Sequence, residues 1–174
     1  MSQQPGRYQR SFSGMIGAML VLLLVVGAFI AFRGMFRTDS EVPVRAVDYQ
    51  RTLSFAQEQV DFPILAPETL PGGWRATSVR FVPEPPRWHL GVLTDEDRYI
   101  GLEQSRSSEK KMVETYVDRD AARGEPVRAA GDTWQKWTDE EGDTALTRVE
   151  DDVTVLVVGT PGIEVLVDYV ETLR

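Results

Sequence analysis

The residues best suited to chemistry lie together at positions 87–105, in the segment RWHLGVLTDEDRYIGLEQS. This segment contains His89, the only histidine of the chain, together with three consecutive acids at 95–97 and a further acid, Glu103. An imidazole next to a carboxylate can act as a general acid and base. The first hypothesis is therefore a hydrolytic site that uses His89 with a nearby carboxylate.

The rest of the sequence offers this histidine no recognisable partner. The chain has no cysteine and no second histidine, and it contains neither G-x-S-x-G nor H-E-x-x-H. A thiol nucleophile and a zinc site are therefore excluded. The acidic runs at 95–97, 139–141 and 150–152 fall in expected turns, and none has the ligand spacing of a calcium loop. We expect no catalytic residue, no metal and no cofactor, and a His89 that bonds to its neighbours in a strand.

Aromatic residues form a second group of candidates. Trp134 and Trp137 are three positions apart, so in a strand they face opposite sides and one is expected to be exposed. Tryptophan more often fills a core than binds a ligand, but an exposed ring can also mark a binding patch. The candidate surface or ligand residues are Trp88, His89, Tyr99, Glu103, Trp134 and Trp137.

Alternating hydrophobicity predicts that a β-hairpin carries the first four of these candidates. Residues 87–93 and 98–104 read as its strands and 94–97 as an acidic turn. Further strands are expected at 74–82, 133–138, 144–150 and 153–160. Helical spacing predicts helices within 47–62 and 107–119, and a last helix with Thr160 as its cap and Pro161 at its first position. Residues 120–132 are expected to be mobile.

The order of these elements, α-βββ-α-βββ-α, defines the fold class. Three strands followed by a helix, twice over, predict an α+β domain with an antiparallel sheet and helices packed on one of its faces. This domain is expected to occupy residues 48–174.

A membrane-spanning helix is predicted at residues 12–32. These 21 residues carry no charge and are flanked by Arg10 and Arg33. As a helix they would extend roughly 31 Å, about the thickness of the hydrocarbon core of a bilayer. Residues 1–11 then form a basic tail, and residues 33–47 a juxtamembrane linker.

Two features of this segment leave alternatives open. Val26-Gly27-Ala28 resembles a signal-peptide cleavage site, but the apolar stretch continues to Phe32, which favours an uncleaved anchor. A strict arginine count would place the large domain in the cytoplasm. Long domains, however, translocate largely regardless of charge, so we expect the N-terminus inside and the domain outside. The small-residue pairs Gly14/Ala18 and Gly27/Ala31 allow a weak helix-mediated dimer.

The charge distribution excludes one class of partner. Residues 1–37 hold four of the 19 basic residues and none of the 27 acidic ones, so the remainder has 15 basic and 27 acidic side chains, a net charge of −12. A domain this acidic repels a phosphate backbone, and its arginines are scattered. Nucleic-acid binding is therefore not expected.

Several segments together resemble a family of uncharacterised single-pass membrane proteins from actinobacteria. They are the proline-rich connector FPILAPETLPGGW at 62–74, the strand WHLG at 88–91, the strand YIGLEQ at 99–104, and WQKW at 134–137. The resemblance covers essentially the whole chain and implies a cell-envelope location with no known activity. The sequence thus predicts a membrane-anchored, non-catalytic domain that binds a protein or an envelope ligand. The alternatives are an envelope hydrolase and a structural subunit of a membrane complex.

Overall fold

The computed structural model describes the helix Phe12–Met35 and residues 46–174. The chain forms two units, Met1–Pro43 and Val44–Arg174. The predicted tail at 1–11 and most of the predicted linker, residues 36–45, lie outside the described residues.

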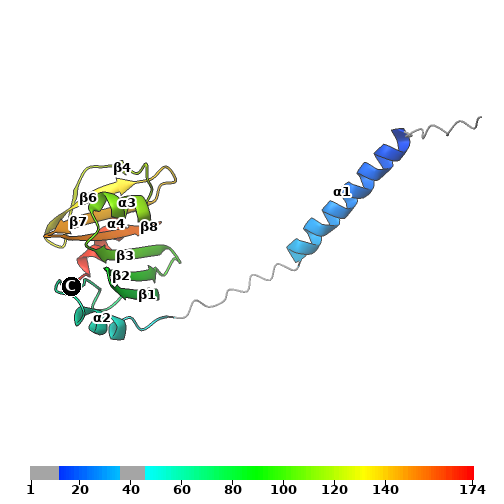
Figure 1. Cartoon of the computed structure of the whole chain (residues 1–174). Helices are drawn as coiled ribbons and strands as arrows, with labels where there is room; N and C mark the ends of the chain where they lie inside the picture. Colours follow the sequence, from blue (N-terminus) through cyan, green and yellow to red (C-terminus); the bar gives the residue numbers. More distant parts are fainter. Residues whose placement is uncertain (1–11, 36–45) are drawn as a thin grey trace, which may run out of the picture. The chain divides into compact units, whose positions relative to one another are not determined.

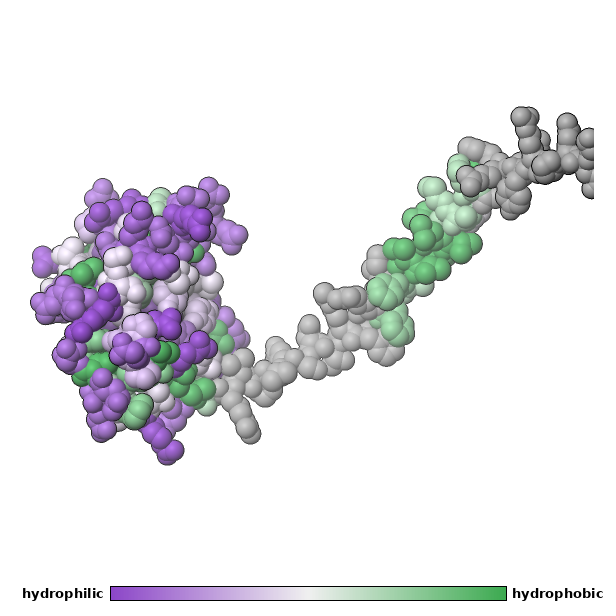
Figure 2. Space-filling view, in the orientation of Figure 1, coloured by the Kyte–Doolittle hydropathy of each residue, from purple (hydrophilic) through white to green (hydrophobic). Residues whose placement is uncertain are grey.

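The first unit contains the helix α1 (Phe12–Met35). Its large described side chains, between Met15 and Phe29 and at Phe32, are exposed, and they form a green, apolar surface in Figure 2. Among the residues that the structure describes, no helix is long and apolar enough to cross a membrane. The span at 12–32 therefore stays a prediction.

The second unit is an α+β domain built on one antiparallel sheet, as predicted (Figure 1). The spatial order of the strands is β1-β2-β3-β8-β7-β6-β4, and β5 pairs with β6. The strands are β1 (Arg75–Pro83), β2 (Pro86–Leu93), β3 (Tyr99–Ser105), β4 (Ala122–Arg123), β5 (Val127–Ala129), β6 (Asp132–Thr138), β7 (Thr144–Glu150) and β8 (Val153–Gly159). The helices are α2 (Gln50–Gln57), α3 (Glu109–Tyr116) and α4 (Ile163–Glu171).

The predicted hairpin is confirmed and forms the adjacent strands β2 and β3 of the sheet. β2 and β3 pair in register, with His89 directly opposite Glu103. The amide of Thr94 donates to the carbonyl of Arg98 across the turn. On its other side β2 pairs with β1, where Arg80 lies opposite His89. Because side chains alternate along a strand, these three residues project from the same face of the sheet.

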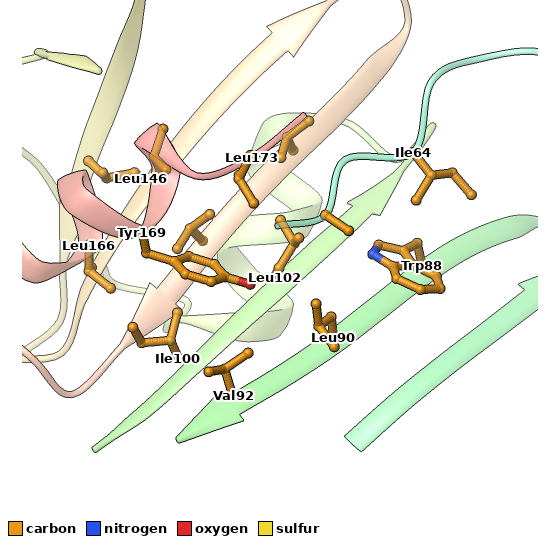
Figure 3. Packing of buried hydrophobic residues seen from close by; sticks show 14 of the residues in the cluster. Ile64, Trp88, Leu90, Val92, Ile100, Leu102, Leu146, Leu166, Tyr169 and Leu173 are labelled. Atoms are coloured by element: carbon orange, nitrogen blue, oxygen red, sulfur yellow. The ribbon is translucent and has the colours of Figure 1, made fainter. Parts of the chain in front are cut away.

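The main hydrophobic core lies on the opposite face. It is formed by alternate residues of β2, β3, β7 and β8, which are covered by α2, α4 and the connector after α2. Figure 3 shows Tyr169 of α4 close to Ile100 and Leu102, which both lie on β3. The largest fully buried side chains here are Ile64, Trp88, Leu90, Val92, Ile100, Leu102, Trp134, Leu146, Val157, Leu166 and Tyr169.

A second, smaller cluster shows that helices cover both faces, not one face as expected. Met112 and Val113 of α3 pack on Leu156 of β8. The neighbours of Leu156 along the strand, Val155 and Val157, belong to the main core. Since successive side chains of a strand point to opposite faces, α3 lies across the sheet from α4.

Two local predictions were wrong. Residues 120–132, expected to be mobile, include β4 and β5, because both segments pair with β6. The last helix begins later than expected, at Ile163, with Gly162 as its N-cap. The amide of Thr160 donates to the carbonyl of Tyr99, so this residue extends the contact with the sheet and does not cap the helix.

The phenol of Tyr169 makes the stability of the domain sensitive to alkaline pH. Its side chain is fully buried, stacks on Trp74 with ring centroids 6.1 Å apart, and its hydroxyl has no hydrogen-bond partner in the described part of the chain. Burial raises the pKa of Tyr169 well above its ordinary value of 10.0. The unfolded chain therefore releases this proton above about pH 10 while the folded chain keeps it, so stability falls as the pH rises.

Above pH 10, the Tyr169 phenol is expected to lower the free energy of unfolding by about 1.4 kcal/mol per pH unit. We expect this decrease to be absent in Tyr169→Phe. At pH 7 the variant should be at least as stable as the native chain, because no hydrogen bond is lost. Denaturant unfolding at pH 7 and pH 11 measures both effects. A shallower decline should remain from the other partly buried phenols, Tyr49, Tyr99 and Tyr116, whose pKa burial also raises. An equally steep decline in the variant would contradict the assignment to Tyr169.

Candidate functional site

His89 is the centre of a hydrogen-bonded row of side chains that crosses three strands. Its Nδ1 lies 2.5 Å from Oε1 of Glu103 on β3, and its Nε2 lies 2.8 Å from Oγ of Ser78 on β1. The side chain of His89 is 25% exposed and that of Glu103 only 7%. The row is therefore a partly buried relay of hydroxyl, imidazole and carboxylate.

A β-bulge and a glycine bring Ser78 into this row. The register between β1 and β2 shifts between Ala76 and Ser78, which places Ser78 opposite Gly91 on the face of His89. A Cβ at position 91 would collide with the hydroxyl of Ser78. Glycine at this position therefore leaves the space in which the serine reaches the imidazole.

The ring of Tyr99 covers two glycines beside the relay. Gly91 and Gly101 lie opposite each other in the hairpin. A Cβ on either would approach the Tyr99 ring to 3.1 Å, tighter than ordinary van der Waals contact. The missing side chains let the ring lie flat against the sheet, an arrangement that compensates for glycine in a strand.

A cavity of about 350 Å³ opens on this face beside the relay. We call it the His89 pocket. Residues of β1, β2 and β3 and the last residue of α3 line it: Arg80, Val82, Arg87, Trp88, His89, Tyr99, Glu103 and Tyr116. Its volume lies within the range of small-molecule binding sites.

The electrostatics of the His89 pocket keep its two phenols neutral. Burial raises the pKa of Tyr99 and of Tyr116 above the ordinary value, and the negative charge of Glu103 raises both further. Both hydroxyls therefore keep their protons near neutral pH and can donate hydrogen bonds. Within the described ranges, no three His, Asp or Glu side chains gather closely enough to hold a metal ion.

The structure brings four of the six candidate residues to this pocket and places the other two elsewhere. Trp88, His89, Tyr99 and Glu103 line it, although the indole of Trp88 is 1% exposed and belongs to the main core. Trp134 and Trp137 of β6 do not line the pocket.

Trp134 and Trp137 do lie on opposite faces of β6, as the spacing predicts. Trp134 is 1% exposed, and its indole N–H donates to the carbonyl of Ala129 at 3.2 Å. Trp137 is partly exposed, donates to Oγ1 of Thr147 at 2.9 Å, and packs beneath the guanidinium of Arg123. Neither ring lines the His89 pocket; Trp134 packs in the main core and Trp137 against the smaller cluster.

Sequence reasoning missed the other polar residues of the site: Ser78, Arg80, Arg87 and Tyr116. A signal for the first two is the imperfect alternation of residues 74–82, which reflects the bulge in β1. Tyr116 lies in the helix predicted within 107–119, but the elements that this helix packs against could not be read from the sequence.

The domain is thus an α+β fold with helices on both faces of an eight-stranded antiparallel sheet and a polar pocket on the face of α3. The chain belongs to a family of proteins of unknown function, DUF4245, whose family model matches residues 7–173. The resemblance to an uncharacterised family over essentially the whole chain is therefore confirmed. No curated protein matches the chain significantly.

Proposed function

We propose that this chain is a membrane-tethered, non-catalytic domain of the cell envelope that binds an envelope ligand in the His89 pocket. The observation that carries this proposal is the pocket itself, a cavity of about 350 Å³ with convergent polar groups beside aromatic rings. Sites of this size that combine apolar walls with a few placed polar groups are the usual form of a small-ligand site.

The tether rests on the composition of residues 12–32. Twenty-one uncharged residues are long enough to cross a bilayer as a helix. We place the short basic N-terminal tail inside and the acidic domain outside. A tether of this kind keeps a binding domain close to the bilayer, where a raised effective concentration favours weak ligands.

The absence of catalysis is proposed from the way His89 is held. Both nitrogens of its ring are engaged, one by Glu103 and the other by Ser78. Ser78 is not among the residues that line the pocket, and its hydroxyl lies against Gly91. A nucleophile must reach the substrate, so this hydroxyl is poorly placed for attack.

A hydrolase is the second candidate function, because the distances from the His89 ring to Ser78 and to Glu103 favour it. Hydroxyl, imidazole and carboxylate lie within hydrogen-bond distance in the order that activates a serine nucleophile. Acyl transfer also requires donors for the oxyanion. The pairing of β2 with both β1 and β3 already uses the backbone amides of β2 around His89.

One labelling experiment separates the two functions. The purified full chain is treated with a fluorophosphonate, which modifies activated serines, and compared with Ser78→Ala and Glu103→Gln. We expect no modification of Ser78 and no hydrolysis of generic esters above the Ser78→Ala background. Labelling at Ser78 that is lost in Glu103→Gln would overturn the non-catalytic proposal in favour of the hydrolase.

Crosslinking tests ligand binding in the pocket. A photoreactive benzoylphenylalanine replaces Val82, which lines the pocket, or Phe55, which is 54% exposed on α2 and whose ring contacts Phe81 of the main core. After irradiation of intact cells, we expect one recurrent mass adduct at position 82 and none at position 55. Equal, heterogeneous adducts at both positions would contradict binding in the pocket.

The tether is tested with single cysteines, since the native chain has none. One cysteine replaces Glu140, in the exposed turn between β6 and β7, and in a separate variant the other replaces Gln3, in the N-terminal tail. In intact cells, a membrane-impermeant maleimide should label the first and reach the second only after lysis. The reverse pattern would overturn the orientation, and release of the chain from membranes by alkaline carbonate would overturn the span.

A further inference from the structure

We infer that the ligand of the His89 pocket carries an anionic group, a carboxylate or a phosphate, that binds between the guanidinium groups of Arg80 and Arg87. This inference rests on the proposed function, because it specifies the chemistry of the ligand of that same site. Three observations support it. The two arginines are neighbours on one face of the sheet, their side chains have no hydrogen-bond or ion-pair partner among the described residues, and the one carboxylate that lines the pocket is bonded to His89.

The sheet places the two arginines as a pair. Arg80 lies opposite His89 on β1, and Arg87 precedes His89 by two residues on β2. They are therefore diagonal neighbours on one face, a relation in which Cβ atoms lie about 7–8 Å apart. Both side chains are exposed and both line the cavity. Long side chains at this separation can converge on one group.

Neither guanidinium is neutralised within the described part of the chain. The side chains of Arg80 and Arg87 make no hydrogen bond or ion pair with any described residue. Their charge instead acts on the phenol of Tyr116, whose pKa both arginines lower against the larger effect of burial. Two guanidinium groups that face one cavity, neither of them paired with a carboxylate, are an incomplete anion site.

A second cavity of the domain is lined by arginines that are paired with carboxylates of the chain. This cavity, of about 220 Å³, is also lined by two arginines, Arg106 and Arg148. Arg106 is paired with Asp61 and Asp152, and Arg148 with Asp132 and Glu150. Carboxylates of the chain itself thus form ion pairs with both guanidiniums. Of the arginines that line these two cavities, Arg80 and Arg87 are the ones without a carboxylate partner in the described part of the chain.

The one carboxylate that lines the His89 pocket does not serve the arginines. Glu103 is buried, and its Oε1 lies 2.5 Å from the imidazole of His89. The neutral hydroxyl of Tyr99 adds a donor to the same cavity, whereas the hydroxyl of Tyr116 is hydrogen-bonded to Glu103. A guanidinium binds carboxylates and phosphates through two parallel hydrogen bonds, which suits the pair to either anion.

The anion has two possible sources, a free metabolite or the headgroup of an anionic lipid, and the test separates them. The full chain in a non-ionic detergent is titrated with inorganic phosphate, glycerol phosphate and, as the neutral match, glycerol, while binding is followed by calorimetry. Separately, the chain is incubated with vesicles of phosphatidylglycerol or of phosphatidylcholine, and glycerol phosphate is added as a competitor.

The critical comparison uses two double variants of equal charge. Arg80→Gln/Arg87→Gln removes the pair, and Arg51→Gln/Arg128→Gln removes two exposed arginines that do not line the pocket. We expect glycerol phosphate to bind and glycerol not to, with affinity at least about tenfold lower in the pocket variant and unchanged in the control. Selective binding to phosphatidylglycerol vesicles that glycerol phosphate displaces assigns the lipid source, and binding of the soluble anion alone assigns the metabolite.

Equal loss in both double variants, or no binding of any anion by the native chain, would overturn the inference. Either result would leave the proposed function in place if the adduct at position 82 still forms and contains no acidic group. If no adduct forms either, both fail together. Circular dichroism of the two double variants at the titration temperature establishes that any loss does not come from unfolding.

Discussion

Replacing Trp134 with alanine is expected to lower the free energy of unfolding by about 3–5 kcal/mol. The indole is 1% exposed and lies in the main core, where β6 pairs with β5. Its N–H bonds to Ala129, and the guanidinium of Arg148 lies 5.4 Å from its ring centroid. The variant loses the buried ring, leaves a cavity, and frees the carbonyl of Ala129.

The matched control is Trp137→Ala on the same strand. Trp137 is partly exposed on the opposite face, so less apolar surface returns to water and we expect a clearly smaller loss. Urea unfolding followed by circular dichroism gives both values. If the two variants were equally destabilised, Trp134 would not be the core residue that its burial indicates.

The hairpin that carries His89 and Glu103 could be predicted because its signals are local. Alternation at 87–93 and 98–104 and the short acidic segment between them determine which strands pair and in which register. The opposition of His89 and Glu103 follows from that register. A local pattern therefore located the half of the relay that lies within one hairpin.

The remaining polar residues of the site could not be predicted from these alternation patterns. Ser78 and Arg80 reach His89 because β1 pairs with β2 across a bulge and a proline-containing connection. Nothing in the alternation of β1 alone says where the register shifts. Tyr116 is positioned by α3, which packs on β8. This strand begins at Val153, 37 residues after Tyr116.

The wrong expectation of helices on one face has a related cause. The amphipathic patterns of α3 and α4 state that each helix buries one side, but they do not say which face of the sheet receives it. That choice is made on β8, which is buried on both faces. Its run VTVLVVG has no hydrophilic face, as expected of a strand covered on both sides.

Leu156→Ala is the second prediction with a large effect, because this one side chain anchors α3. Leu156 is fully buried against Met112 and Val113 and lies beside Glu103 in the sheet. We expect the free energy of unfolding to fall by about 2–5 kcal/mol. We also expect α3 to loosen first, since the smaller cluster has few other buried contacts to hold it.

Leu146→Ala is the control, because it removes the same atoms from an equally buried leucine on the opposite face. Hydrogen exchange should show faster exchange of the amides of α3, such as Met112 and Val117, in Leu156→Ala only. Because α3 carries Tyr116 into the His89 pocket, that variant should also bind glycerol phosphate more weakly. Equal exchange of α3 in both variants would show that the helix is held by something other than the Leu156 cluster, and the proposed route from this cluster to the pocket would be wrong.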